Sequence, residues 1–183
     1  MEELLEARQE AARRGLTLPL YLHSGESNRA ENENLYDAIL LGASRIGHGV
    51  ALFKHPRLME LVKERGIAVE VCPLSNQMLG YVPDLRNHPA VLYINAGLPV
   101  VLSTDDPAIM RHSLSHDFYV AFMAWGLDLR SLKQLAMNSL IYSSLSPDEK
   151  RAALAVWETR WQAFVAWVNQ ESGIRDQGSG IRD

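Results

Sequence analysis

The chain has 183 residues, of which 47% are hydrophobic, and its 18 basic and 22 acidic residues give it a net charge of −4. This length and composition predict one globular domain with a hydrophobic core. Because nucleic acids and anionic membranes select basic surfaces, the acidic and unclustered charge argues against both as main partners and leaves small molecules open.

Targeting and redox features are sparse in this sequence. No apolar run approaches the ~18 residues that a membrane-spanning helix needs, and the N-terminal stretch MEELLEARQEAARRG lacks the layout of a signal peptide. We therefore leave the localisation open. The only cysteine, Cys72, excludes an internal disulfide and a multi-thiolate zinc site, and we expect it to pack in the core.

The first third of the chain alternates between helical and extended patterns. Residues 2–14 carry apolar side chains at helical spacing and are followed by Gly15, which predicts an amphipathic helix. Beyond it, strands are expected over 16–23 (LTLPLYLH) and 44–49 (SRIGHG), and helices over 32–43 and 55–66.

The same alternation continues through the rest of the chain. Strands are expected over 67–76 (IAVEVCPLSN) and 98–107 (LPVVLSTDDP), with a short helix over 88–97 between them. Asp128 is expected to cap a helix over 129–145, and SPDE at 146–149 predicts a capping box that begins a last helix. Aromatic residues of that helix recur at spacings of three and four, which predicts a core-facing stripe. Residues 172–183 repeat SGIRD and are predicted to be a disordered tail.

Polar side chains follow each of the four expected strands. Alternating strands and helices predict parallel β-α-β units, whose ligands gather at the carboxyl ends of the strands. Those ends read His23-Ser-Gly-Glu26, Gly47-His48-Gly49, Pro73-Leu-Ser75-Asn76 and Ser103-Thr-Asp105-Asp106. Each ending alone has a structural reading, such as a helix cap at Asp-Asp-Pro, but their recurrence favours a site. Imidazoles and carboxylates are ligands for zinc and similar cations, so the pattern predicts a hydrolytic metal site.

The motifs HSGES, RIGHG, EVCPLSNQ and STDDP, in this order and spacing, resemble the adenosine deaminase family of zinc hydrolases. Flanking stretches such as LRNHPAV and HDFYVAFM are most similar to the adenosine deaminase 2 branch, also called adenosine deaminase-related growth factors, whose members are often secreted. The resemblance covers roughly residues 18–168 and implies an α/β fold. We expect the C-terminal half of a (β/α)8 TIM barrel, about four β/α units, as a partial barrel domain over residues 1–171.

The resemblance also implies roles for single residues. His23 and Asp105 would be zinc ligands, and Glu26 would protonate adenine N1. His48 would orient or deprotonate the attacking water, and Asp106 would hydrogen-bond N7 of the purine. The implied reaction is zinc-dependent hydrolytic deamination of adenosine or 2′-deoxyadenosine to the inosine product.

This reaction needs these residue types. Breaking the bond from C6 to the amine requires hydroxide at neutral pH, and a metal lowers the pKa of water from ~15.7 to ~7. Because attack destroys ring aromaticity, N1 must receive a proton, which a carboxyl group such as that of Glu26 can donate. Gly25 is expected to let the backbone approach the substrate closely. Cytidine-type deaminases need a pair of cysteines, which this sequence lacks.

The sequence departs from the family pattern because it contains no His-x-His, the pair of zinc ligands on the first barrel strand. Four units are half of a closed barrel, so we expect an incomplete zinc site, little turnover and self-association through open strand edges. We favour a fragment of a complete deaminase over a natural short form or a half-barrel that pairs with another chain. For the other histidines we expect no catalytic role. We expect solvated or capping roles for His112 and His116, and structural roles for His55 and His88.

Two other functions stay open at this point. An AMP deaminase shares the Ser-Thr-Asp-Asp-Pro ending, although no cluster of Lys and Arg near the strand ends would hold a phosphate. A non-catalytic binding or growth-factor-type module is also compatible with the resemblance. Conversion of adenosine that disappears in Glu26→Gln would argue against such a module.

Overall fold

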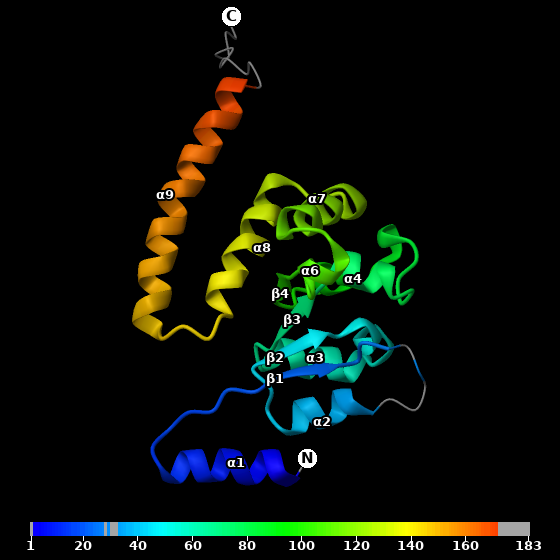
Figure 1. Ribbon diagram of the computed structural model, residues 1–183, viewed down its shortest axis with the longest axis vertical. Coiled ribbons are helices and arrows are strands. Elements are labelled where there is room, and N and C mark those ends of the chain that lie inside the picture. The colour runs from blue at the N-terminus through cyan, green and yellow to red at the C-terminus, as the bar shows by residue number, and fades with distance from the viewer. Residues whose placement is uncertain (1, 28, 30–32, 172–183) are drawn as a thin grey trace, which may run out of the picture. The chain divides into compact units, whose positions relative to one another are not determined.

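The computed structural model describes residues 2–27, 29 and 33–171 (Figure 1). The chain divides into two compact units, Met1–Ser144 and Leu145–Asp183. The expected tail, residues 172–183, lies outside the described residues, and the expected domain extent of 1–171 stays a prediction.

The described residues of the first unit contain a four-stranded parallel sheet. Its strands are β1 (Tyr21–Ser24), β2 (Arg45–His48), β3 (Ala68–Val71) and β4 (Val100–Leu102), and they lie in sequence order. The register aligns their carboxyl ends, with Ser24 opposite His48 and Val71 opposite Leu102. The predicted gathering of strand ends at one edge of the sheet is therefore present.

Helices follow and flank these strands. Short helices connect the strands: α2 (Asn34–Leu40), η1 (Val50–Lys54), α3 (Pro56–Glu64), α4 (Pro73–Met78), η2 (Leu85–Asn87) and α5 (Ala90–Asn95). The other helices are α1 (Glu2–Arg13), ahead of the sheet in sequence, and α6 (Pro107–Met110), α7 (Leu114–Trp125) and α8 (Leu129–Ile141), which follow it. Helices α3, α4 and α6 begin with proline, whose fixed φ and missing N–H suit a first helical position.

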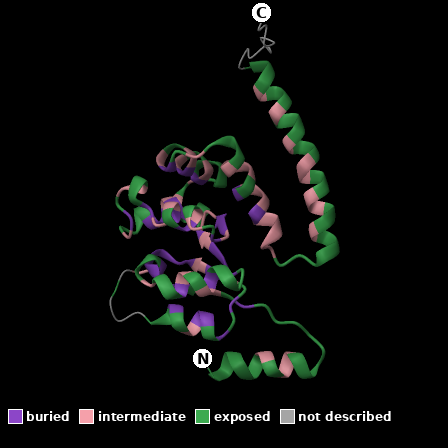
Figure 2. Ribbon diagram, turned by 180° about the vertical axis from the view of Figure 1, so that it is seen from behind, coloured by how far each residue is buried: buried purple, intermediate pink, exposed green. Residues whose placement is uncertain are grey.

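The core of this unit lies between the sheet and the helices that cover it. Every residue of β4 is buried, and Ile46, Val69 and Val71 of the neighbouring strands are fully shielded from solvent. Figure 2 shows the buried residues on the strands and on the helix faces turned toward them. Full burial of one such aliphatic side chain contributes about 1.5–3 kcal/mol, so this layer fixes the sheet that carries the site. Cys72 is buried, as expected.

Two sequence expectations need correction. Strand β3 ends at Val71, and the stretch from Pro73 onward, which we expected to continue the strand, forms α4 because proline favours the first turn of a helix. The last helix, α9 (Pro147–Glu171), begins with the predicted capping box of Ser146 and Glu149, but none of its residues is buried. Its aromatic rings contact one another instead, with Trp157 stacked on Trp161 at 5.5 Å between ring centroids.

None of the helices in the described part of the chain has the length and apolarity needed to cross a bilayer.

Candidate active site

Three of the predicted site residues converge at the carboxyl end of the sheet. His23 belongs to β1, His48 ends β2, and Asp105 follows β4, and one potential ligand atom from each lies within 4.8 Å of the others. The imidazole rings of His23 and His48 are 5.0 Å apart between centroids. We call these three residues the metal-ligand cluster, after His23 and Asp105, the two that we predicted to be zinc ligands. An imidazole and a carboxylate are donors that fit zinc.

The backbone is unusual at two of these residues. His48 has a φ of 65° and Asp105 a φ of 60°, the left-handed region that non-glycine residues rarely adopt. Such a conformation costs on the order of 1–3 kcal/mol and persists only where the surrounding structure imposes it. Because this strain occurs at two candidate site residues that come from the ends of β2 and β4 and lie close together, it is an observation in favour of a functional site.

Helix α4 holds the carboxylate of Asp105. The buried hydroxyl of Ser75 donates to Asp105 Oδ2 at 2.7 Å, which leaves the other carboxylate oxygen for a cation. The helix is itself anchored, because the backbone N–H of Leu74 donates to the buried Asp117 Oδ1 at 3.1 Å. Burial raises the pKa of Asp117, although the Leu74 N–H and the nearby His112 oppose that shift.

The imidazole of His48 is held at its Nδ1 atom. Asn76, also in α4, places its side-chain nitrogen 3.3 Å from His48 Nδ1, and its oxygen lies 3.1 Å from Nε2 of His88. The turn after His48 is fixed by the buried Tyr93, whose hydroxyl donates to the carbonyl oxygen of Gly49 at 2.7 Å. With Nδ1 engaged, His48 presents Nε2 to the site.

Glu26 lies on the turn beyond β1, as expected. Its Oε1 is 3.7 Å from His48 Nε2, and its side chain is 31% exposed. A surface recess of about 650 Å³ borders this place and is lined by His23, Ser24, Glu26, Ser27, Arg29, Asn34 and Tyr81. A second recess, of about 450 Å³, lies at the amino end of β4 and is lined by residues such as Pro99 and Tyr142, away from the metal-ligand cluster.

Gly25 has a backbone reason for being glycine. Its φ is +63°, and a Cβ at this position would lie 2.7 Å from the Leu35 side chain. Its N–H donates to Asn34 Oδ1 at 2.8 Å, and its carbonyl accepts from the Ala51 N–H at 2.7 Å. These contacts set the path of the turn that carries Glu26, and a substrate contact by Gly25 stays a prediction.

The remaining predicted residue, Asp106, is exposed and lies at the N-cap position of α6 without a side-chain capping bond. Its carboxyl group is adjacent in sequence to the metal-ligand cluster. Its expected contact with purine N7 stays a prediction.

The other histidines differ in their surroundings. His116 caps α7, since its Nδ1 accepts from the Ser113 N–H at 3.1 Å, in line with the capping expectation. His112 is not solvated, because its side chain is 7% exposed and its Nε2 lies 2.9 Å from Asp117 Oδ2. His55 lies beside Tyr36 at the surface, with 3.2 Å between the Tyr36 hydroxyl and His55 Nδ1.

Three residues that support the site were not predicted to hold its side chains: Ser75, Asn76 and His88. The first two stood in the motif EVCPLSNQ, but we took them as a strand end, whereas they lie in the first turns of α4. His88 was expected to be structural because it precedes a proline. The sequence feature that could have identified two of them is the polar pair Ser75 and Asn76, placed directly after a buried strand.

Comparison with known proteins agrees with this geometry. The adenosine deaminase family model matches residues 2–157. Adenosine deaminase 2 of Sus scrofa is 50% identical over 168 residues, which cover 88% of this chain and 33% of that protein. The chain thus spans about a third of the length of the curated relatives it matches.

Solved structures show the same fold. Adenine deaminase from Arthrobacter aurescens superposes with a TM-score of 0.74 at 28% identity, over 87% of this chain and 47% of that one. An amidohydrolase from Burkholderia ambifaria with bound zinc gives a TM-score of 0.77 over 91% of this chain and 46% of that one, at 24% identity. The prediction of half a TIM barrel is confirmed by these matches and by the parallel sheet. The chain belongs to the adenosine deaminase family, within its adenosine deaminase 2 branch.

Proposed function

We propose that this chain carries the metal-binding and proton-transferring part of an active site for hydrolytic deamination of adenosine or 2′-deoxyadenosine. The observation that carries the proposal is the convergence of His23, His48 and Asp105 within 4.8 Å, with Glu26 3.7 Å from His48. Membership in a family of deaminases supports the reaction class. The recess beside Glu26 offers room for a small purine nucleoside.

His23 and Asp105 would hold the cation, and zinc is the ion that we propose. The Burkholderia structure contains zinc, and nitrogen and oxygen donors of this kind suit that ion. When bound, zinc would lower the pKa of a water molecule to about 7 and so supply hydroxide at neutral pH. Ser75 would orient Asp105 for this role through its hydrogen bond to Oδ2.

The organic part of the reaction would fall to Glu26, His48 and Asp106. Water would add to C6 of the purine while the Glu26 carboxyl group gives its proton to N1. Of the two protons of the water, one would pass to the amine, which leaves C6 as ammonia, and the other would return to Glu26, which leaves the inosine product. His48 faces the attacking oxygen through Nε2. Asp106 would hydrogen-bond N7, a contact that needs a proton between the carboxyl group and the N7 lone pair.

We further propose that the chain by itself turns over little substrate. Two metal ligands leave the coordination of zinc unfinished, so binding would be weak. The activity then depends on ligands from outside the 183 residues.

A zinc titration of the purified chain tests the site. We expect weak binding that weakens at least about tenfold further in His23→Gln and in Asp105→Asn, because each removes one ligand. His55→Gln is the matched control, since His55 lies at the surface beside Tyr36. Equal zinc affinity in all four proteins would contradict the proposed site.

The ultraviolet absorbance of adenosine, followed in the same samples, tests the chemistry. We expect slow conversion at most, and loss of any conversion in Glu26→Gln. Conversion that survives Glu26→Gln would remove Glu26 from its proposed role.

A further inference from the structure

A buried chain of three side chains leads away from the candidate active site. His48 Nδ1 contacts the Asn76 side-chain nitrogen at 3.3 Å, and the Asn76 oxygen contacts His88 Nε2 at 3.1 Å. The three residues are at most 2% exposed. We call them the His48–Asn76–His88 relay. Because water does not reach these groups, each proton in the relay must be assigned to a partner within it.

The direction of the relay is set at its far end by the backbone. The N–H of Ala90 donates to His88 Nδ1 at 3.0 Å, and a backbone amide can only donate. His88 Nδ1 is therefore unprotonated. Burial lowers the pKa of His88 to about 4, so at neutral pH the ring is neutral and carries its single proton on Nε2.

The remaining assignments follow step by step. His88 Nε2–H donates to the Asn76 oxygen, which leaves the Asn76 amino group facing His48. That group is a donor only, so His48 Nδ1 must accept. A proton on His48 Nδ1 would place two donors against each other. Turning the Asn76 amide around does not help, because its amino group would then face the proton on His88 Nε2.

We propose that Asn76 and His88 are positioning residues that hold neutral His48 as the tautomer with its proton on Nε2. This inference deepens the proposed function and rests on it. In this tautomer His48 donates a hydrogen bond to the reacting oxygen. It is neither a cation ligand nor the base that takes the first proton, because its one available lone pair is turned inward to Asn76.

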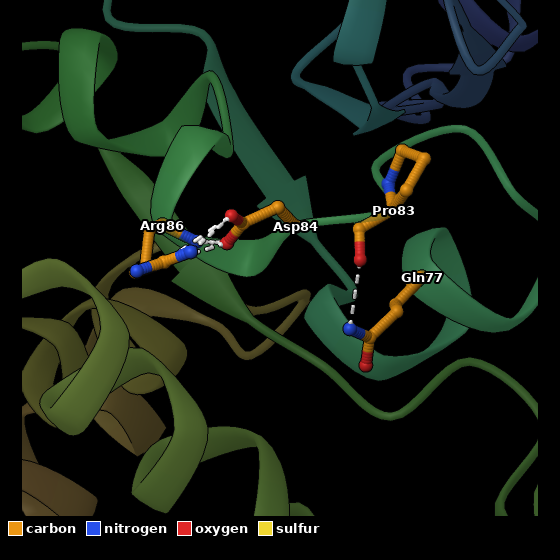
Figure 3. A network of polar contacts seen from close by, with 4 residues as sticks. All are labelled: Gln77, Pro83, Asp84 and Arg86. Atoms are coloured by element: carbon orange, nitrogen blue, oxygen red, sulfur yellow. Dashed lines mark hydrogen bonds and ion pairs between the residues drawn. The ribbon is translucent and has the colours of Figure 1, made fainter.

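The surrounding structure keeps the relay in place. The segment between Asn76 and His88 is braced by the Gln77 side chain, which donates to the Pro83 carbonyl at 3.1 Å, and by Asp84, which binds Arg86 (Figure 3). Trp125 packs its ring 5.3 Å from that of His88 and donates to the Leu85 carbonyl at 3.0 Å. Of these contacts, the ring contact of Trp125 is the one that involves a relay residue directly.

The decisive test is the tautomer of His48 in Asn76→Asp, measured by ¹⁵N NMR of the histidine rings in the metal-free chain at a pH about two units above the ordinary histidine pKa of about 6.5. In the parent chain we expect a protonated Nε2 and a bare Nδ1. A carboxylate accepts from both neighbours, so Asn76→Asp should move the His48 proton to Nδ1. An unchanged Nε2 proton in a folded Asn76→Asp chain would overturn the proposal.

Two further measurements keep the test sharp should Asn76→Asp fail to fold. In Asn76→Leu, which has no donor or acceptor, His48 should sample both tautomers and show averaged ring shifts. In the parent chain His88 should carry its proton on Nε2. A proton on His88 Nδ1, or a single unchanged tautomer of His48 in Asn76→Leu, would contradict the relay.

Zinc binding tests one consequence of this tautomer, namely that His48 is not a metal ligand. On zinc addition the His23 ring signals should shift, while His48 keeps its Nε2 proton. In Asn76→Asp the freed Nε2 becomes a ligand, and zinc affinity should rise several-fold. Loss of the His48 Nε2 proton on zinc binding to the parent chain would overturn the proposal. The tautomers are measured without metal or substrate, so failure of the proposed deamination leaves this result separately visible.

Discussion

The hydroxyl of Ser75 donates to Asp105 Oδ2 at 2.7 Å and is the contact that orients this carboxylate. In metal sites, such an outer partner fixes the ligand's rotamer and adds to the affinity. Ser75 is fully buried, so no water would replace a lost hydroxyl without rearrangement.

Ser75→Ala should therefore weaken zinc binding by about 10-fold or more while the fold persists. Equilibrium dialysis against zinc measures this change, and circular dichroism checks the fold. Ser115→Ala, at an exposed position of α7, should bind zinc as the parent does. Equal affinity of the Ser75 and Ser115 variants would show that the hydrogen bond does not orient Asp105 for a metal.

At the scale of elements, the turn after β1 depends on the absence of a side chain at Gly25. Its positive φ is shared with Gly66, but the surroundings differ. A Cβ on Gly25 would lie 2.7–2.9 Å from three Leu35 carbon atoms, whereas a Cβ on Gly66 would meet nothing within 4 Å. The two glycines thus separate the cost of backbone strain from the cost of a steric clash.

Gly25→Ala should lower the free energy of unfolding by about 1–3 kcal/mol more than Gly66→Ala, because only the first overpacks the core. Urea unfolding of both variants at one pH measures the difference. Similar losses for the two would mean that α2, which carries Leu35, moves aside freely. In that case the turn is not the rigid support of Glu26 that we describe.

The order of elements and the convergence of His23, His48 and Asp105 at one edge of the sheet could be predicted from the sequence, because both depend on local patterns. Alternating apolar runs and helix signals predicted the parallel sheet, and polar endings pointed to His23, His48 and Asp105. The roles of the residues that support the cluster could not be predicted in this way. Asn76 and His88 act through tertiary contacts with each other and with His48, and no spacing rule connects positions 48, 76 and 88. The α4 helix was missed because the β-branched run before it masked the helix start at Pro73.

At the scale of the whole molecule, resistance to acid should reflect His88. Its folded pKa of about 4 lies below the ordinary value of 6.5, so the unfolded chain binds the proton more tightly. This stability is fully present above about pH 6.5 and is lost as the pH falls toward about 4. At about 1.4 kcal/mol per pKa unit, the loss amounts to about 3 kcal/mol.

Urea unfolding between pH 7 and pH 4.5 measures this dependence. His88→Gln should be less stable at pH 7 but flatter with pH, whereas His55→Gln, altered at the surface, should keep the slope of the parent. A His88→Gln chain with the parent's slope would show that another group governs acid stability.

Self-association through the edge strands β1 and β4 of the sheet stays a prediction.

The placement of the metal-ligand cluster has a consequence for how the sheet assembles during folding. His23 comes from the first strand and Asp105 follows the last, 82 positions later (105 minus 23), and the strands pair in sequence order. A cation that needs both residues binds only after all intervening strands have docked. It would therefore stabilise only the completed sheet, by an amount that grows with the logarithm of the zinc concentration once that concentration exceeds the Kd. Zinc in a refolding mixture would therefore stabilise chains whose four strands have all paired and would not stabilise chains whose strands are only partly paired.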